Sequence, residues 1–84
     1  MKDLNKEDLQ FLLDIKTSLD TDSQCEVFLK YKDIYILLEP HGPNIVVYVN
    51  GKEIAKYLTF DEMIYQFILD GKPFIERISE IEYE

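Results

Sequence analysis

The sequence predicts an α+β fold, in which a four-stranded antiparallel meander packs on two main helices as a two-layer α-β-β-β-β-α sandwich. Apolar positions in residues 25–58 alternate with the period of a strand, whereas those on either side recur at helical spacing. Asn50-Gly51 is the preferred two-residue hairpin turn between two such strands. The charge follows the same division. Residues 25–58 carry four lysines and four acidic residues and are neutral, whereas residues 1–24 have a net charge of −3 and residues 59–84 one of −5. We therefore expect a neutral sheet with acidic helices on one face.

The chain has the size of one small domain, residues 1–84, and a net charge of −8. No uninterrupted apolar stretch approaches the roughly 20 residues that a membrane span needs, and the charged N-terminal residues do not resemble a signal peptide. The single cysteine, Cys25, cannot form an internal disulfide. We therefore expect a reduced, cytoplasmic protein.

The first helix is expected over about residues 5–19. Asn5 is a suitable N-cap, and Glu7 and Asp8 place acidic groups in the first turn, where the helix dipole favours them. The apolar positions are Leu9, Phe11, Leu12, Leu13, Ile15 and Leu19. Their arc is about 200° wide, so this helix should contact more than one element.

Four strands follow, over residues 25–31, 34–38, 45–49 and 53–58. The turn sequence Pro40-His41-Gly42-Pro43 separates the second strand from the third. A second helix is then capped by Thr59 or Asp61 and closed by Gly71. Its apolar face consists of Phe60, Met63, Ile64, Phe67 and Ile68.

The end of the chain allows two interpretations. Pro73 suits the first turn of a further short helix that contains Ile75, Ile78 and Ile81. A final strand over residues 77–83 is the alternative, and periodicity does not separate the two.

The two faces of the predicted sheet are both apolar. Successive strand residues point to opposite faces. The set assigned to the core is Val27, Leu29, Ile36, Leu38, Val47, Val49 and Ile54. The opposite set is Phe28, Lys30, Tyr35, Leu37, Val46, Tyr48, Ala55 and Tyr57. A sheet with one face in water should be polar on that face, and this one is rich in tyrosine.

Tyrosine is enriched where proteins bind one another. We therefore predict a protein interface, first of all for self-association, at Phe28, Tyr35, Leu37, Val46, Tyr48 and Tyr57. In the alternative, the C-terminal segment folds across this face and covers it with its four large apolar residues, Phe74, Ile75, Ile78 and Ile81.

A second candidate surface lies on the second helix, opposite its apolar face, and comprises Asp61, Glu62, Tyr65 and Leu69. It would be an acidic surface with an aromatic anchor, suited to a basic groove on another protein. In the alternative interpretation Leu69 meets Phe74 as the chain doubles back.

Residues with catalytic or metal-binding chemistry are sparse. His41 lies in a turn with Glu39 two residues away, and two ligands at the end of a strand do not make a metal site. No catalytic residue, metal or cofactor is predicted, and the acidic balance disfavours nucleic acid and anionic membranes as partners. Residues 58–64 and 70–74 resemble the generic end of many small uncharacterised bacterial and phage-type proteins, and that resemblance implies no activity.

We therefore expect a small, acidic, non-enzymatic protein-interaction module of the inhibitor, immunity or antitoxin kind. Its partner would be a second copy in a homodimer or another protein with a basic surface. The alternative is a small-molecule-binding regulatory domain, in which the sheet and the C-terminal segment enclose an apolar molecule.

Overall fold

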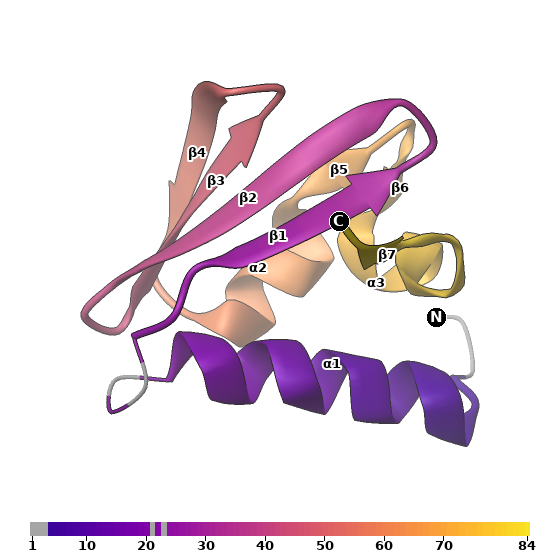
Figure 1. Cartoon of the computed structure of the whole chain (residues 1–84), viewed down its shortest axis with the longest axis horizontal. Coiled ribbons are helices and arrows are strands. Elements are labelled where there is room, and N and C mark those ends of the chain that lie inside the picture. The colour runs from indigo at the N-terminus through magenta and orange to yellow at the C-terminus, as the bar shows by residue number, and fades with distance from the viewer. Residues whose placement is uncertain (1–3, 21, 23) are drawn as a thin grey trace.

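The computed structural model describes residues 4–20, 22 and 24–84, which form an α+β fold with the helices on one face of an antiparallel sheet (Figure 1). In chain order the elements are α1 (Lys6–Leu19), β1 (Val27–Tyr31), β2 (Ile34–His41), β3 (Asn44–Val49), β4 (Lys52–Tyr57), α2 (Phe60–Gln66), β5 (Ile68–Leu69), β6 (Lys72–Pro73), α3 (Phe74–Arg77), the 3-10 helix η1 (Ile78–Glu80) and β7 (Glu82–Tyr83). The main sheet has the order β4-β3-β2-β1-β7, and β5 and β6 form a separate small hairpin. The predicted fold class is confirmed, and the meander gains a fifth strand at its β1 edge.

Helix α1 forms where the sequence predicts it. The side chain of Asn5 accepts a hydrogen bond of 2.8 Å from the backbone N–H of Asp8, which caps the helix. Its buried residues are Leu12, Ile15 and Leu19. The helix contacts β1, β2 and η1, as its wide apolar arc predicts. No helix within the described ranges is long and apolar enough to cross a membrane.

A β-bulge changes the faces of β4. Val47 pairs with Ala55, whereas the next residue, Tyr48, pairs with Glu53, so that Ile54 is the extra residue. Ala55 and Tyr57 therefore lie on the core side, and Ile54 is 48% exposed. The predicted assignment of these three residues is wrong because a strict period of two cannot register an inserted residue.

The second predicted helix is too long. Helix α2 begins after Thr59, whose hydroxyl accepts a hydrogen bond of 3.0 Å from the N–H of Glu62, but it ends at Gln66. The chain then forms the β5–β6 hairpin, with Asp70 and Gly71 at φ +52° and +86° in its turn. Asp-Gly is a hairpin turn as well as a helix end, and here the hairpin forms.

The C-terminal segment combines both predicted alternatives, since a short helix is followed by a two-residue strand on β1. Its four large apolar residues, Phe74, Ile75, Ile78 and Ile81, are all buried in the core with α1 and α2. Helix α3, with which this segment begins, lies on the same side of the sheet as α1 and α2 (Figure 1). The alternative in which these four residues cover the opposite face is therefore wrong, because the hairpin turns the chain back beneath the sheet.

Tyr31 anchors this segment. Its side chain is fully buried, and its hydroxyl donates a hydrogen bond of 3.0 Å to Oδ2 of Asp70. That hydrogen bond, together with the charge of Lys32 (Nζ 3.6 Å from the same oxygen), holds the pKa of Asp70 below its usual value. The guanidinium of Arg77 lies 5.7 Å from the centre of the Tyr31 ring, and its Nε donates to the carbonyl of Leu69 at 3.1 Å. The β1–β2 turn, the small hairpin and α3 are thereby tied together.

Candidate interaction surface

The sheet face that points away from the helices, here called the outer face, has an apolar row across its middle. Leu37 on β2 lies directly opposite Tyr48 on β3 on one side and opposite Phe28 on β1 on the other. Glu53 lies opposite Tyr48 at one end of the row. At the other end, the N–H of Glu84 donates a hydrogen bond of 3.0 Å to the carbonyl of Phe28. A glutamate therefore stands at each end of the apolar row.

The rows on either side carry charge. On one side, Lys30 lies between Tyr35 on β2 and Glu82 on β7. On the other side, Val46 lies between Glu39 on β2 and Lys56 on β4. Glu26 comes one residue before the Val27–Leu38 pair and continues this second row beside Glu39. The outer face thus holds five glutamates and two lysines, a net charge of −3 with His41 neutral.

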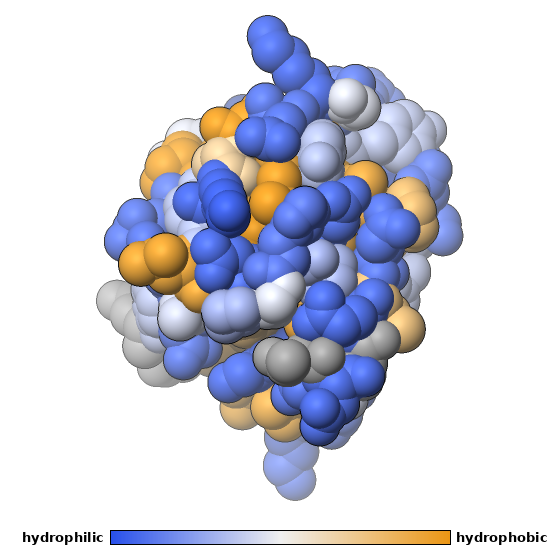
Figure 2. Space-filling model, turned by 90° about the vertical axis from the view of Figure 1, so that its left-hand side faces the viewer, coloured by the Kyte–Doolittle hydropathy of each residue, from blue (hydrophilic) through white to orange (hydrophobic). Residues whose placement is uncertain are grey.

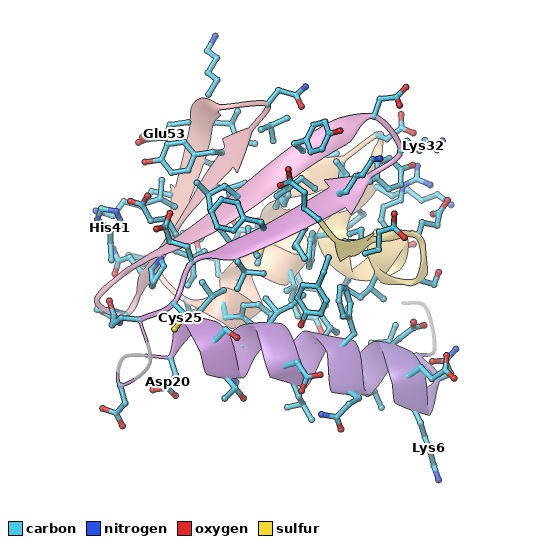
Figure 3. The ribbon with its side chains drawn as sticks, viewed as in Figure 1. Lys6, Asp20, Cys25, Lys32, His41 and Glu53 are labelled. Carbon is cyan, nitrogen blue, oxygen red and sulfur yellow. The ribbon has the colours of Figure 1, made fainter. Side chains whose placement is uncertain are left out.

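The aromatic side chains of the outer face are open to solvent. Phe28 is 51% exposed and Tyr35 45% exposed, whereas Leu37 and Tyr48 are half-buried. In Figure 3 aromatic rings stand on the near side of the β1–β3 strands, and no helix crosses in front of them. These four side chains form one continuous surface on three neighbouring strands.

Two of the six predicted sheet-face residues do not contribute to the accessible surface. Tyr57 pairs with the buried Ile45 and packs against the core, because the bulge shifts the faces of β4. Val46 does lie on the outer face, but it is only 4% exposed and is not accessible to a partner. Four of the six therefore form the accessible part of the surface.

A shallow depression of about 180 Å³ lies on the outer face beside Leu37, between Glu84 and the β3–β4 turn. It is lined by Phe28, Tyr35, Leu37, Gly51 and Glu84, together with Ile36. The ammonium group of Lys30 lies 5.7 Å from the centre of the Tyr35 ring at this place. The depression is mainly apolar, and Glu84 is the one acidic residue that borders it.

The carboxylates of the outer face affect the pKa of Tyr48. The pKa of Tyr48 is raised above its usual value, first by partial desolvation and then by the negative charges of Glu39, Glu53 and Glu26. Glu39 also contacts Nε2 of His41.

Sequence reasoning placed the negative charge on the helices and missed the acidic rim that the glutamates of the outer face form. Glu26, Phe28 and Lys30 are two residues apart, so strand alternation alone places them on one face and would have shown part of the rim. The contribution of Glu82 and Glu84 depends on the position of β7, which the sequence does not show.

The second predicted surface is not formed as a unit. Leu69 is 3% exposed and lies with Phe74 in the core, as the alternative interpretation has it, because the chain leaves the helix at Gln66. Asp61 lies 3.9 Å from Nζ of Lys16, which offsets part of its charge. Tyr65 is 49% exposed on α2, and Glu62 is partly exposed beside it. Without Leu69, the exposed part of the predicted set is Tyr65 with Asp61 and Glu62.

At the end of the molecule near His41, the described residues form no comparable surface. Hydrophilic residues cover most of this side, and hydrophobic residues form small separate groups (Figure 2). Cys25, labelled in Figure 3 where the chain enters β1, is exposed. Among the described residues, no group of three or more His, Cys, Asp or Glu side chains could hold a metal ion.

Comparison with known proteins gives no relative from which to transfer a function: no protein-family model matches the chain, and neither a curated protein nor a solved structure matches it. The functional proposal therefore depends on the surface of this chain.

Proposed function

We propose that the protein is a small, non-enzymatic interaction module that binds another protein molecule through the outer face of its sheet. The observation that carries the proposal is the exposure of Phe28 and Tyr35 on a face that none of the described helices covers. An antiparallel sheet that faces water normally alternates apolar and polar sides. Covering exposed aromatic side chains with a partner lowers the free energy, because apolar surface leaves water. Phe and Tyr side chains bury about 150–250 Å² each when that happens.

Inhibitors, immunity proteins and antitoxins act by contact in this way, and a cytoplasmic location fits the single cysteine. The partner is a second copy of the chain or a different protein with a basic surface.

The alternative function, a small-molecule-binding regulatory domain, has less support. Three depressions on the described residues each hold only about 160–190 Å³, below the roughly 300 Å³ of small ligand pockets.

The test is retention of proteins from a cell extract on the immobilised chain, with Tyr35→Lys and Tyr48→Lys as the variants. Tyr65→Lys is the matched control, because it places the same change on an exposed tyrosine of the helical side. Light scattering at low and high salt measures self-association of the same four proteins. Circular dichroism and urea unfolding establish that each variant is folded.

The proposal expects a retained protein or a dimer that both sheet variants lose and that Tyr65→Lys keeps. If only Tyr65→Lys loses binding, the interface lies on α2 and the proposal is wrong. If the chain is a monomer and all four proteins retain the same material, no binding depends on the outer face, and the proposal fails as well.

A further inference from the structure

The charges around the outer face distinguish between the two kinds of occupant. In a symmetric dimer the same patch meets itself, so each set of five glutamates and two lysines would face an identical set. Like charges placed opposite one another across an interface oppose association. Within the part of the chain that the structure describes, Glu26, Glu53, Glu82 and Glu84 are exposed and have no ion-pair partner. A basic partner supplies the cations that this rim lacks.

The apolar row also defines a length. It runs across five strands from Glu53 to Glu84, and neighbouring strands are about 4.8 Å apart, so the two ends are separated by about 19 Å. An extended chain advances about 3.3 Å per residue. Two side chains that are six residues apart on an extended segment therefore span the distance between the two glutamates.

The depression beside Glu84 favours one kind of cation. Its lining residues include Phe28, Tyr35 and Glu84. The ammonium group of Lys30 already lies over the Tyr35 ring, so the exposed ring of Phe28 is the one left for an incoming cation. A guanidinium group stacks on aromatic rings and forms paired hydrogen bonds with a carboxylate, whereas an ammonium group is a compact and strongly hydrated charge. The depression therefore suits arginine better than lysine.

Resting on the proposed function, we infer that the outer face binds an extended, arginine-flanked apolar segment of another protein. One arginine lies in the depression against Glu84, apolar side chains cover Leu37 and Tyr48, and a second arginine, six residues away, pairs with Glu53. The segment lies across the strands, so its side chains rather than its backbone make the contacts.

The inference is tested with the full chain and synthetic peptides. The probe is acetyl-Arg-Gly-Leu-Gly-Phe-Gly-Arg-amide, which places both arginines, the leucine and the phenylalanine on one side of an extended chain. Two peptides serve as controls. In one, glutamate replaces both arginines; in the other, acetyl-Arg-Arg-Gly-Leu-Gly-Phe-Gly-amide, the composition is kept but the arginines are adjacent. Amide chemical shifts of the ¹⁵N-labelled protein measure affinity and locate the contact.

We expect the probe to shift resonances of β1, β2 and β3 and to bind more tightly than both control peptides. Glu53→Gln and Glu84→Gln should each weaken binding by about two- to five-fold, which is the effect of one exposed ion pair. Binding should also weaken as salt is added. Glu7→Gln removes one exposed negative charge from α1 and serves as the matched control, with binding unchanged. Urea unfolding confirms that each variant is folded.

Other results would overturn the inference. If both arginine peptides bind equally, the spacing is irrelevant; if the glutamine variants bind like the native chain, the glutamates are not the site. A dimer that Tyr48→Lys dissociates, without peptide binding, makes a second copy the occupant and leaves the proposed function standing. If neither a peptide, nor a second copy, nor any extract protein depends on the outer face, both proposals fail.

Discussion

Ile78 tests whether the C-terminal segment belongs to the core, which is the arrangement that leaves the outer face uncovered. Ile78 is 1% exposed in η1, whereas Ile54 at the β-bulge is 48% exposed. The substitution Ile78→Val removes one methyl group from the buried side chain. Ile54→Val makes the identical change in a side chain that already contacts water, so it is the matched control.

The expected cost follows from burial. Removing one buried methyl group by an isoleucine-to-valine change costs about 1 kcal/mol in the free energy of unfolding, the sum of lost transfer free energy and the small cavity left behind. The same change at Ile54 should cost less than about 0.5 kcal/mol, which is usual for surface substitutions. The urea m-value of a chain of this size is about 1–1.5 kcal/mol/M. The unfolding midpoint should therefore fall by about 0.7–1 M urea for Ile78→Val and by much less for Ile54→Val.

Circular dichroism at increasing urea concentration measures both midpoints, and a constant m-value shows that the comparison is valid. Equal midpoints for the two variants would refute the placement of the C-terminal segment in the core. A larger loss for Ile54→Val than for Ile78→Val would refute the β-bulge register as well.

Three further predictions concern stability. Tyr31→Phe should lower the free energy of unfolding by about 1 kcal/mol in urea unfolding, because a fully buried side chain loses the hydrogen bond of its hydroxyl; an unchanged midpoint would contradict this anchor. The lowered pKa of Asp70 contributes stability above the unfolded pKa of about 3.9 that is lost as the pH falls through the folded value. The urea midpoint should therefore drop less from pH 5 to pH 2.5 in Asp70→Asn than in the native chain. An identical drop in both proteins would argue against the lowered pKa of Asp70. Thr59→Ala should cost about 1 kcal/mol by thermal unfolding, since it removes the cap of α2; no change in melting temperature would mean that this cap is not needed.

Local signals in the sequence were sufficient for most of the fold. Asn5 and Thr59 predict two helix starts, and Asn50-Gly51 predicts a hairpin, because each depends on contacts within a few residues. The wrong assignments have non-local causes. The bulge at Val47–Tyr48 depends on how β3 pairs with β4, and no periodicity in either strand shows it.

The candidate surface was predictable in part for the same reason. Strand alternation places Phe28, Tyr35, Leu37 and Tyr48 on one face, and the structure places them there. The acidic rim was missed because Glu84 joins that face only through the pairing of β7 with β1, between segments more than fifty residues apart. Leu69 was misplaced because Asp-Gly is compatible with both a helix end and a hairpin.

Hydroxyl-radical footprinting of the chain, alone and bound to whatever protein it retains from a cell extract, tests the central proposal most directly. The account predicts that Phe28, Tyr35 and Tyr48 are oxidised in the free chain and protected in the complex. Tyr65, exposed on the helical side, should be oxidised equally in both. Protection of Tyr65 with unchanged oxidation of the three outer-face residues would contradict the account and place the interface on α2.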